Sequence, residues 1–549
     1  VTTKLWKYYP QFADLGLRYY PFLDDHEEVL AKLIIENYNE PFVQANPDFA
    51  EMMLKYSELF PSEAPYHALD HWAPTSPRHF VEFFHLDHPC VERYILGSME
   101  EASLDNTKFV IPQIIQCLRH QESVETVEKV LLSAASKDEV LAAYIYWQLK
   151  GEKTPPKEAF NPVIKRSGWK PPEDVGLWKV SDRLLSNFSA AVPAKTKEMV
   201  RYQVSYFDKV YEVATHLGSV SKESRVKELR SKLKELEDPV HPVYIPFYPD
   251  KFIDSIEYQS CITLASAAKI PILVFFNTTT AEGVKERIGC IFKVGDDCRQ
   301  DVLALQIVSM LQTTFKEAGL KAYLYTYGVI VTDFECGLIE VIPNTKSRSG
   351  LGELSDCGLV QIFKQNFGSP GTDKFERARQ NFIRSAAGYA VSSFILWAKD
   401  RHNGNIMIDK EGHLIHIDFG FIFGISPGGN LGFENAGFKL SHEMCQLIDP
   451  LGNRQSPEYK YFKNLCIRGF LAARRRSQDI IDCVSLMDQS GLPCFGYGKP
   501  IEFLKQRLAI HMHTNEAAAY FEGVVDDAYM KWTTGFYDLV QFLQQGIPK

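Results

Sequence analysis

The sequence lacks three features that would assign it to common protein classes. Its 11 cysteines are scattered without a Cys-x-x-Cys pair or a zinc-ligand spacing, which indicates buried thiols in a reducing compartment. It has no basic excess, and a net charge of −9 argues against a general nucleic-acid binder. No apolar run approaches the roughly 18 residues of a membrane span, and the sequence shows no secretory signal or prenylation motif. Any membrane contact is therefore expected to be peripheral or provided by a partner.

What is present is enough for several folded domains. The chain has 549 residues, 45% hydrophobic and 23% charged, which suggests about three or four domains. Closely spaced short helical patterns predict a solenoid-like helical domain over residues 1–150. Residues 151–240 are interpreted as a helical linker region, and the proline-rich stretch 239–249 marks a boundary. Strand-type sequence follows over 241–342, with one of the expected strands at 321–331, and helical patterns predominate over 343–549. The expected fold class is α+β.

The most informative stretch is KDRHNGNIMIDKEGHLIHIDFG at 399–420. Two apolar runs around turn residues predict a β-hairpin. Asn405 precedes the outgoing strand and Asp418 follows the returning one, so an amide oxygen and a carboxylate are expected at the same end. Such hard oxygen ligands suit Mg²⁺, which takes its other ligands from water and phosphates. Asp400 lies five residues before Asn405, the Asp-to-Asn spacing of the protein-kinase catalytic loop, and Asp-Phe-Gly follows.

The order Asp-Arg-His inverts the His-Arg-Asp order of protein kinases, and with the downstream HIDFG it resembles the phosphoinositide kinase superfamily. Within it, the sequence resembles the type III phosphatidylinositol 4-kinases, the alpha form most closely, over roughly residues 100–549. The resemblance implies a bilobal protein-kinase-like lipid kinase fold: an all-α accessory domain, a small antiparallel-sheet N-lobe and a mainly helical C-lobe with a C-terminal amphipathic helix. The matching stretches are SAAK at 266–269, FKVGDDCRQD at 292–301, ALQI at 304–307, KDRHNGNIM at 399–407, HIDFGF at 416–421, SPGGNLG at 426–432 and GLPCF at 491–495.

Candidate ATP-phosphate ligands precede the hairpin. Lys293 stands in an apolar strand, where a lysine needs a partner. We interpret it as the ATP-phosphate lysine rather than an edge-strand lysine, because Asp301 begins the following helix. The resemblance implies that Asp301 pairs with Lys293 or holds a metal-bound water. The loop 265–269 has small residues, the Ser266 hydroxyl and the Lys269 cation, which suit phosphate binding, although a plain hairpin is the default reading.

The resemblance also implies the lining of an adenine pocket. Glu340 would supply a carbonyl and Ile342 an amide, and Tyr327 would line the back of the pocket. The alternative for all three is ordinary sheet core. The apolar walls around adenine would come from Ile291, Met407 and Ile417.

The expected reaction is transfer of the ATP γ-phosphoryl group to the 4-hydroxyl of phosphatidylinositol, which needs positioning and charge neutralisation. Mn²⁺ is an alternative to Mg²⁺. Asp400 or His402 would accept the hydroxyl proton: spacing favours Asp400, and the resemblance favours His402. Arg401 is expected to orient the loop. The activation loop 421–440 holds a single basic residue, Lys439, which favours an unphosphorylated head group as substrate.

Two alternatives remain at this point: a Ser/Thr protein kinase of the phosphoinositide-kinase-related type, and a helical scaffold with an inactive kinase fold. The expected partners are membrane phosphatidylinositol and scaffold proteins on the helical region, with dimers formed through scaffold assembly and no nucleic acid. The resemblance implies a cytoplasmic protein recruited to the plasma membrane. The apolar pattern at 536–543 would either dip into a membrane interface or dock on the lobe. Arg474-Arg475-Arg476 is interpreted as a solvated helix end rather than a lipid site.

Overall fold

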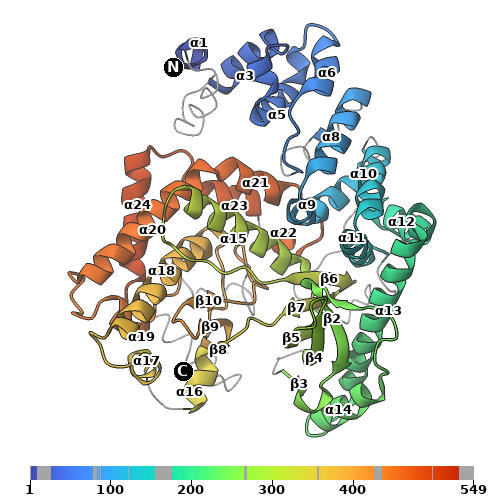
Figure 1. Ribbon diagram of the computed structural model, residues 1–549. Coiled ribbons are helices and arrows are strands. Elements are labelled where there is room, and N and C mark those ends of the chain that lie inside the picture. Colours follow the sequence, from blue (N-terminus) through green and yellow to red (C-terminus); the bar gives the residue numbers. More distant parts are fainter. Residues whose placement is uncertain are drawn as a thin grey trace. The chain divides into compact units, whose positions relative to one another are not determined.

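The computed structural model describes most of the chain and divides it into two compact units (Figure 1). The first unit combines the chain up to Cys298 with residues 328–341, and the second combines residues 299–327 with the chain from Ile342 onward. Within the described ranges, no helix is both long and apolar enough to cross a bilayer. The described ranges are 2–8, 26–77, 83–84, 86, 88–120, 123–154, 176–264, 269–354, 358–425, 436–497 and 499–530.

The first unit begins with short helices, as the sequence predicts. The last helix of the row, α11 (Glu139–Gly151), is apolar on nearly all sides, which is typical of a buried helix. The Asp138 side chain accepts the N–H of Leu141 at 2.8 Å and so caps its first turn. The helices before it are α1 (Thr2–Tyr8), α3 (His26–Glu36), α4 (Pro41–Gln44), α5 (Pro47–Lys55), α6 (Ala64–Ala68), α8 (Pro89–Glu101), α9 (Leu104–Gln116) and α10 (Val124–Lys137).

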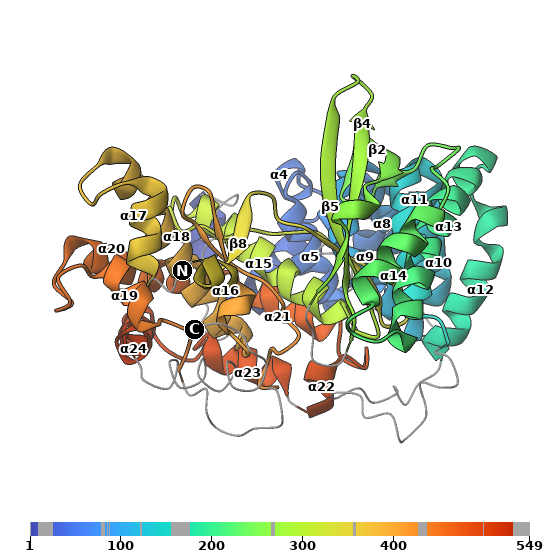
Figure 2. The same ribbon diagram turned by 90° about the horizontal axis from the view of Figure 1, so that it is seen from below.

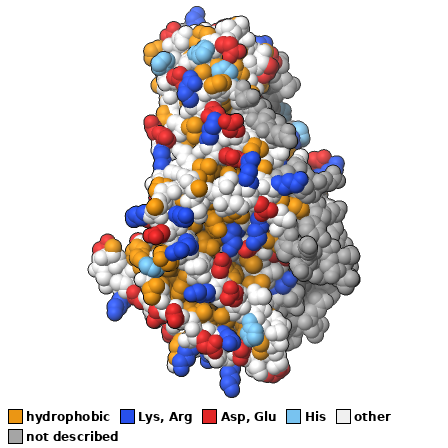
Figure 3. Space-filling model, turned by 90° about the vertical axis from the view of Figure 1, so that its right-hand side faces the viewer, with side chains coloured by type: hydrophobic (Ala, Val, Ile, Leu, Met, Phe, Trp, Pro, Cys, Tyr) orange, Lys and Arg blue, Asp and Glu red, His pale blue; other side chains and the backbone are white. Residues whose placement is uncertain are grey.

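Three further helices lead to the sheet: α12 (Gly176–Ala191), α13 (Ala194–His216) and α14 (Arg225–Glu235). On the face that includes α12 and α13, acidic and basic side chains are mixed with hydrophobic ones (Figure 3). On α14, Leu229 and Leu233 are buried, so its apolar stripe packs on the body of the protein.

The sheet of the first unit is antiparallel in the order β1-β2-β4-β5-β7-β6, with β3 paired to β4. Its β2, β4 and β5 strands extend past the neighbouring helices in Figure 2. The strands are β1 (Tyr244–Ile245), β2 (Tyr248–Ile256), β3 (Ile262–Thr263), β4 (Ile272–Thr280), β5 (Lys285–Val294), β6 (Val329–Asp333) and β7 (Cys336–Glu340).

One face of this sheet packs on α13 through aromatic rings. The ring of Phe292 on β5 lies 5.9 Å from Phe207 and 5.0 Å from Tyr211, measured between centroids. Because side chains alternate along a strand, Ile291 and Lys293 belong to the opposite face.

The second unit is mostly helical around the long helix α18 (Asp373–Leu396), which contacts α15, α17, α19, α20 and β10. The strands β8 (Thr345–Ser347), β9 (Ile406–Asp409) and β10 (Leu414–His416) form a small sheet in the order β10-β9-β8. The other helices are α15 (Arg299–Glu317), α16 (Arg348–Leu354), α17 (Leu359–Phe367), α19 (His442–Ile448), α20 (Pro457–Arg475), α21 (Ser477–Ser485), α22 (Pro493–Tyr497), α23 (Pro500–Arg507) and α24 (Thr514–Ala528).

The expected architecture is confirmed: helices, then an antiparallel sheet, then a mainly helical region. The division at residues 150, 240 and 342 stays a prediction, and the pattern at 536–543 lies outside the described residues.

Two local expectations are wrong. A strand over 321–331 begins only at Val329, because Tyr323 donates its N–H to Arg384 of α18 at 3.0 Å instead of joining the sheet. Arg474 is not solvated: its guanidinium is buried and donates to the carbonyls of Leu508 and Ala509 at 2.9 and 3.0 Å.

Candidate functional site

The predicted hairpin is present, and its register brings its two ends together. Ile406 of β9 pairs with His416 of β10, and the next step is the hydrogen bond from Ile417 N–H to the Asn405 carbonyl at 3.1 Å. Asn405 and Asp418 therefore lie at the same open end of the hairpin, as predicted. Their roles as metal ligands stay a prediction.

The side chain of Asn405 is held in one orientation. Its Nδ2 donates to the carbonyl of Asp400 at 3.0 Å, and its backbone N–H donates to the carbonyl of His402 at the same distance. The residue is buried, with 7% of its surface exposed. Since the amide nitrogen is engaged, the oxygen Oδ1 is the atom that remains for a cation.

Arg401 fastens the catalytic loop to the end of β10. Its Nε donates to the Lys399 carbonyl at 2.9 Å and its Nη1 to the Ile417 carbonyl at 2.6 Å, and its Nη2 donates to the Asp418 carbonyl. All three acceptors are backbone oxygens, so this buried guanidinium orients the loop, as predicted.

The two candidate proton acceptors lie close together but differ in geometry. Asp400 has a left-handed backbone conformation with a φ of 60°, which turns the loop sharply. His402 Nε2 lies 4.0 Å from Asp400 Oδ2, and His402 Nδ1 accepts the N–H of Gly404 at 3.0 Å. Burial lowers the pKa of His402; Asp400 opposes this effect, and Arg401 adds to it. His402 is therefore neutral at neutral pH.

The Asp-Phe-Gly segment is anchored by two residues at the start of α15. Asp301 Oδ1 accepts the N–H of Phe419 at 2.8 Å, a contact that the sequence did not predict. Pairing of Asp301 with Lys293 stays a prediction. Gln300 donates to the carbonyls of Phe419 and Gly420 at 3.2 and 2.6 Å.

Gln300 also links this segment to a distant part of the chain. Its Oε1 accepts the N–H of Cys494 at 3.0 Å, and only 1% of the residue is exposed. Sequence reasoning missed Gln300. The Arg-Gln-Asp run at the start of α15 was its only signal.

His416, of the HIDFG motif, packs against α18 and supports the fold around the hairpin. It is buried, its ring is stacked on Tyr389 at 4.6 Å between centroids, and its Nδ1 lies 3.3 Å from Ser393 Oγ. Burial lowers its pKa well below the usual value, with Arg401 and Lys439 adding to this effect. His416 therefore stays neutral and fixes β10 on α18.

In the first unit, two candidate phosphate-binding lysines belong to the same end of β5. Lys293 is the residue before the last of β5 and pairs with Gly337 of β7. The Lys269 side chain lies against Gly295, in the turn after β5, where an added Cβ would meet Lys269 Nζ at 2.5 Å. Ser266 lies outside the described residues.

The structure gives the hydrogen bonds and the burial of the residues that were expected to surround adenine. The Glu340 carboxylate accepts the N–H of Gly328 at 2.7 Å and the hydroxyl of Tyr248. The hydroxyl of Tyr327, in the second unit, accepts the N–H of Asp418 at 3.2 Å. Ile342 is buried and is the residue at which the second unit resumes. The expected apolar walls are half-buried: Ile291, Met407 and Ile417. The adenine-binding roles of all these residues stay predictions.

The one basic residue of the activation loop contacts the catalytic loop. Lys439 Nζ donates to Asn403 Oδ1 at 3.2 Å. Residues 426–435, with the whole SPGGNLG stretch, lie outside the described ranges.

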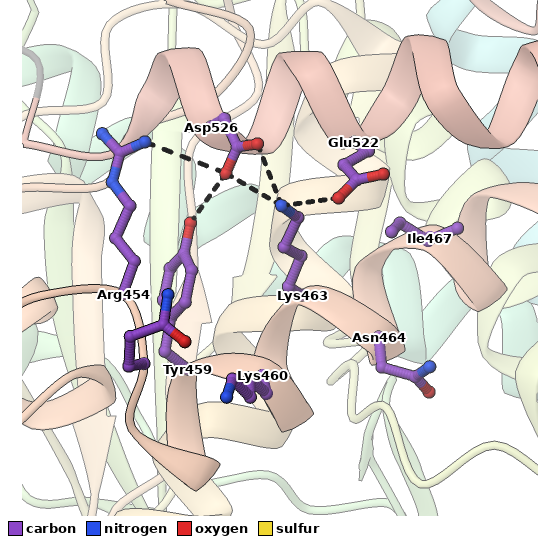
Figure 4. Close-up of a pocket in the computed structure, with 9 residues that line it drawn as sticks. Arg454, Tyr459, Lys460, Lys463, Asn464, Ile467, Glu522 and Asp526 are labelled. Atoms are coloured by element: carbon purple, nitrogen blue, oxygen red, sulfur yellow. Dashed lines mark hydrogen bonds and ion pairs between the residues drawn. The ribbon is translucent and has the colours of Figure 1, made fainter.

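A separate pocket of about 480 Å³ lies between α20 and α24 (Figure 4). Lys463 on its wall contacts Glu522 at 2.7 Å and Asp526 at 2.9 Å, and the Tyr459 hydroxyl donates to Asp526 at 3.1 Å. Arg454 Nη1 also lies 4.0 Å from Asp526 Oδ1, so two cations pair with these two carboxylates. The pocket contains none of the predicted site residues.

Comparison with known proteins finds two family models that match different parts of the chain. "Phosphatidylinositol 3- and 4-kinase" matches residues 287–496, which include most of β5, the hairpin and the Asp-Phe-Gly segment. "Phosphoinositide 3-kinase family, accessory domain (PIK domain)" matches residues 29–169, in the helical region.

Individual proteins of this family are similar to the chain over most of its length. The chain is 43% identical to phosphatidylinositol 4-kinase alpha 2 of Arabidopsis thaliana over 77% of this chain and 78% of that protein. It is 43% identical to phosphatidylinositol 4-kinase alpha 1 of the same plant over 88% of this chain, and 35% identical to phosphatidylinositol 4-kinase STT4 of Saccharomyces cerevisiae over 95% of it. The chain spans only 24% and 27% of those two longer proteins. Together with the hairpin and its anchored Asp-Phe-Gly segment, these matches show that the chain belongs to the phosphatidylinositol 3- and 4-kinase family, among the alpha-type phosphatidylinositol 4-kinases.

Proposed function

We propose that this chain transfers the γ-phosphoryl group of ATP to the 4-hydroxyl of phosphatidylinositol at a membrane surface. The observation that carries the proposal is the hairpin end, where Asn405 and Asp418 meet beside Asp400 and His402, in a chain whose relatives are named phosphatidylinositol 4-kinases. A protein-kinase activity is not favoured, because none of the relatives named above is called a protein kinase.

The donor set at the hairpin end fits Mg²⁺. An amide oxygen and a carboxylate are hard ligands, and the hydrogen bond from Asn405 Nδ2 to Asp400 leaves Oδ1 for the ion. In this proposal Asn405 and Asp418 hold Mg²⁺, or Mn²⁺ in its place, and the ion neutralises phosphate charge. Lys293 and Lys269 bind the phosphates of ATP through their ammonium groups.

We assign proton acceptance to Asp400 and a different role to His402. Because His402 Nδ1 accepts a backbone N–H, its lone pair is engaged and the neutral ring carries its proton on Nε2. A ring in that form donates from Nε2 and cannot accept a proton there. Asp400 therefore takes the proton of the inositol hydroxyl, and His402 donates a hydrogen bond to the phosphoryl group in transfer.

The substrate proposal rests on the activation loop. It has one basic residue, and Lys439 is engaged with Asn403 of the catalytic loop. A head group that already carries ring phosphates needs several cations to bind it. Unphosphorylated phosphatidylinositol suits this loop better.

The setting of the reaction is also part of the proposal. The substrate lies in a membrane, so the chain works as a peripheral protein on the cytoplasmic side of the plasma membrane. Scaffold proteins bound to the helical region bring it there and assemble it into dimers. Nucleic acid is not a partner.

The test is a kinase assay with phosphatidylinositol vesicles, ATP and Mg²⁺, in which the product is identified by head-group chromatography. The proposal predicts phosphatidylinositol 4-phosphate, little phosphorylation of a Ser/Thr peptide, and slower reaction with a doubly phosphorylated head group. Faster phosphorylation of the peptide or of the doubly phosphorylated lipid would contradict it.

A further inference from the structure

Lys150, in the last turn of α11, bridges two carboxylates from different elements of the first unit. Its Nζ lies 3.1 Å from Asp208 Oδ1 on α13 and 3.4 Å from Asp333 Oδ2 at the end of β6. Only 13% of the Lys150 side chain is exposed. A lysine this buried is costly unless it is paired, and here two carboxylates offset that cost. The bridge therefore joins a helix of the accessory region to a strand of the kinase region.

A close backbone approach at the same place provides a second contact. Gly151 is the last residue of α11, and a Cβ added there would meet Val331 Cγ1 of β6 at 2.5 Å. Lys153, just after the helix, adds an ion pair with Asp333 Oδ1 at 2.8 Å. The end of α11 is thus fixed on β6 both by packing and by charge.

From Asp333 the contacts continue through the turn between β6 and β7. The Asp333 carboxylate accepts the N–H of Phe334 at 2.7 Å. Glu335 follows in a left-handed conformation with a φ of 51°, and its carbonyl accepts the N–H of Gly295 at 2.7 Å. A carboxylate held by α11 therefore shapes the turn that holds Gly295.

Gly295 lies next to both candidate phosphate lysines. It follows Lys293 by two residues, and the Lys269 side chain lies directly against it. Val294, between Lys293 and Gly295, pairs with Cys336 at the other end of the same turn. The series of contacts thus runs from Lys150 through Asp333 and the turn to the segment that carries the ammonium groups.

We propose that Lys150 is a positioning residue for ATP, through which the helical accessory region sets the place of the phosphate-binding lysines. It does not touch ATP itself. The inference rests on the proposed function in that it takes Lys293 and Lys269 as phosphate ligands. It predicts that loss of the bridge weakens nucleotide binding more than it slows phosphoryl transfer.

The experiment measures the dissociation constant of a fluorescent ATP analogue, together with KM for ATP and for phosphatidylinositol, and kcat. Lys150→Met should raise the dissociation constant of the analogue and the KM for ATP about fivefold, which is within the range for loss of coupling contacts. The kcat and the KM for phosphatidylinositol should change less than about twofold. Lys129→Met is the matched control, because its ion pair with Glu92 is exposed and links only helices. It should leave all four quantities unchanged.

Two further variants trace the route. Asp208→Asn leaves the contact of Lys150 with Asp333 in place and should have the smaller effect. Asp333→Asn removes the ion pairs of both Lys150 and Lys153 with β6 and should have at least the effect of Lys150→Met. The double variant Lys150→Met, Asp333→Asn should be little worse than Asp333→Asn alone, because the contact of Lys150 with β6 is already lost in Asp333→Asn. Lys153→Met is the milder variant if Lys150→Met does not fold, and should raise the ATP constants about twofold.

An unchanged dissociation constant for the ATP analogue in folded Lys150→Met would overturn the inference. So would a lower Tm accompanied by changes of similar size in kcat and in both KM values. If the proposed function is wrong, the unaltered chain will not phosphorylate the lipid. The nucleotide-binding measurement needs no lipid, so it tests the role of Lys150 separately.

Discussion

The side-chain amide of Asn405 donates a 3.0 Å hydrogen bond to the backbone carbonyl of Asp400. This bond joins the start of the catalytic loop to its end, and it fixes which atom of Asn405 can face a cation. The carboxylate of Asp418, at the same end of the hairpin, completes the pair of proposed magnesium ligands.

Asn405→Asp tests this bond directly. The variant keeps an oxygen ligand but removes the N–H donor and places a carboxylate against the Asp400 carbonyl. Losing a buried hydrogen bond and adding that repulsion costs about 1.5–3 kcal/mol, so kcat should fall about 10- to 100-fold. Steady-state assays with phosphatidylinositol vesicles measure this. Asn464→Asp, at an exposed position on α20, is the control and should behave as the unaltered chain.

Gln300→Met tests the anchor of the Asp-Phe-Gly segment. It removes three hydrogen bonds at a residue that is 1% exposed, and leaves the carbonyls of Phe419 and Gly420 without this donor. We expect kcat to fall at least tenfold and the free energy of unfolding to drop by about 1–3 kcal/mol.

The control for this variant lies on the same helix. Gln312→Met removes a single hydrogen bond, from Gln312 Nε2 to the Leu324 carbonyl at 2.7 Å, and should leave kcat within about twofold of its original value. Equal losses of kcat in the two variants would show that Gln300 only supports the fold of α15.

Gly295→Ala tests the contact with Lys269. The glycine has a φ of 83°, so alanine is strained there by about 1 kcal/mol, and its methyl group displaces the Lys269 ammonium. We expect a several-fold higher KM for ATP. Gly283→Ala imposes the same backbone strain at a φ of 81° with nothing within 4 Å of the added atom, so its KM for ATP should not change.

His416 predicts how stability depends on pH. Its pKa is lowered in the folded chain, so between that value and the usual value near 6.5 the unfolded chain binds a proton that the folded chain does not. The free energy of unfolding therefore rises with pH in this window and falls as the pH drops below about 6.5, by up to ~1.4 kcal/mol per unit.

His416→Gln removes this titration while keeping polar atoms near Ser393. Tm measured between pH 7.5 and 5.5 should fall less steeply in the variant than in the unaltered chain. Identical slopes would show that His416 does not remain neutral in the folded protein.

The features that sequence predicts well are those made by neighbours in the chain. The hairpin at 399–420 follows from two short apolar runs around turn residues, and the buried stripe of α15 follows from its helical spacing. The anchoring role of Arg401 was also expected, because its partners lie within 17 residues of it.

The features that it misses depend on distant segments. Gln300 bonds to Cys494, 194 positions away, and Arg474 caps the end of α23 instead of facing solvent. The strand expected at 321–331 begins only at Val329, because the backbone N–H of Tyr323 bonds to Arg384 of α18 instead of joining the sheet. No periodicity reveals such partners, since they are chosen by tertiary packing.

The most direct test of the magnesium site is the turnover of ATP with phosphatidylinositol vesicles by the Asp418→Ala variant, with Tm measured on the same sample. If Asp418 holds the ion beside Asn405, turnover falls at least a thousandfold while Tm stays within a few degrees and the unaltered chain yields phosphatidylinositol 4-phosphate. A folded Asp418→Ala variant that keeps more than a tenth of the turnover of the unaltered chain would contradict the role of Asp418 as a magnesium ligand.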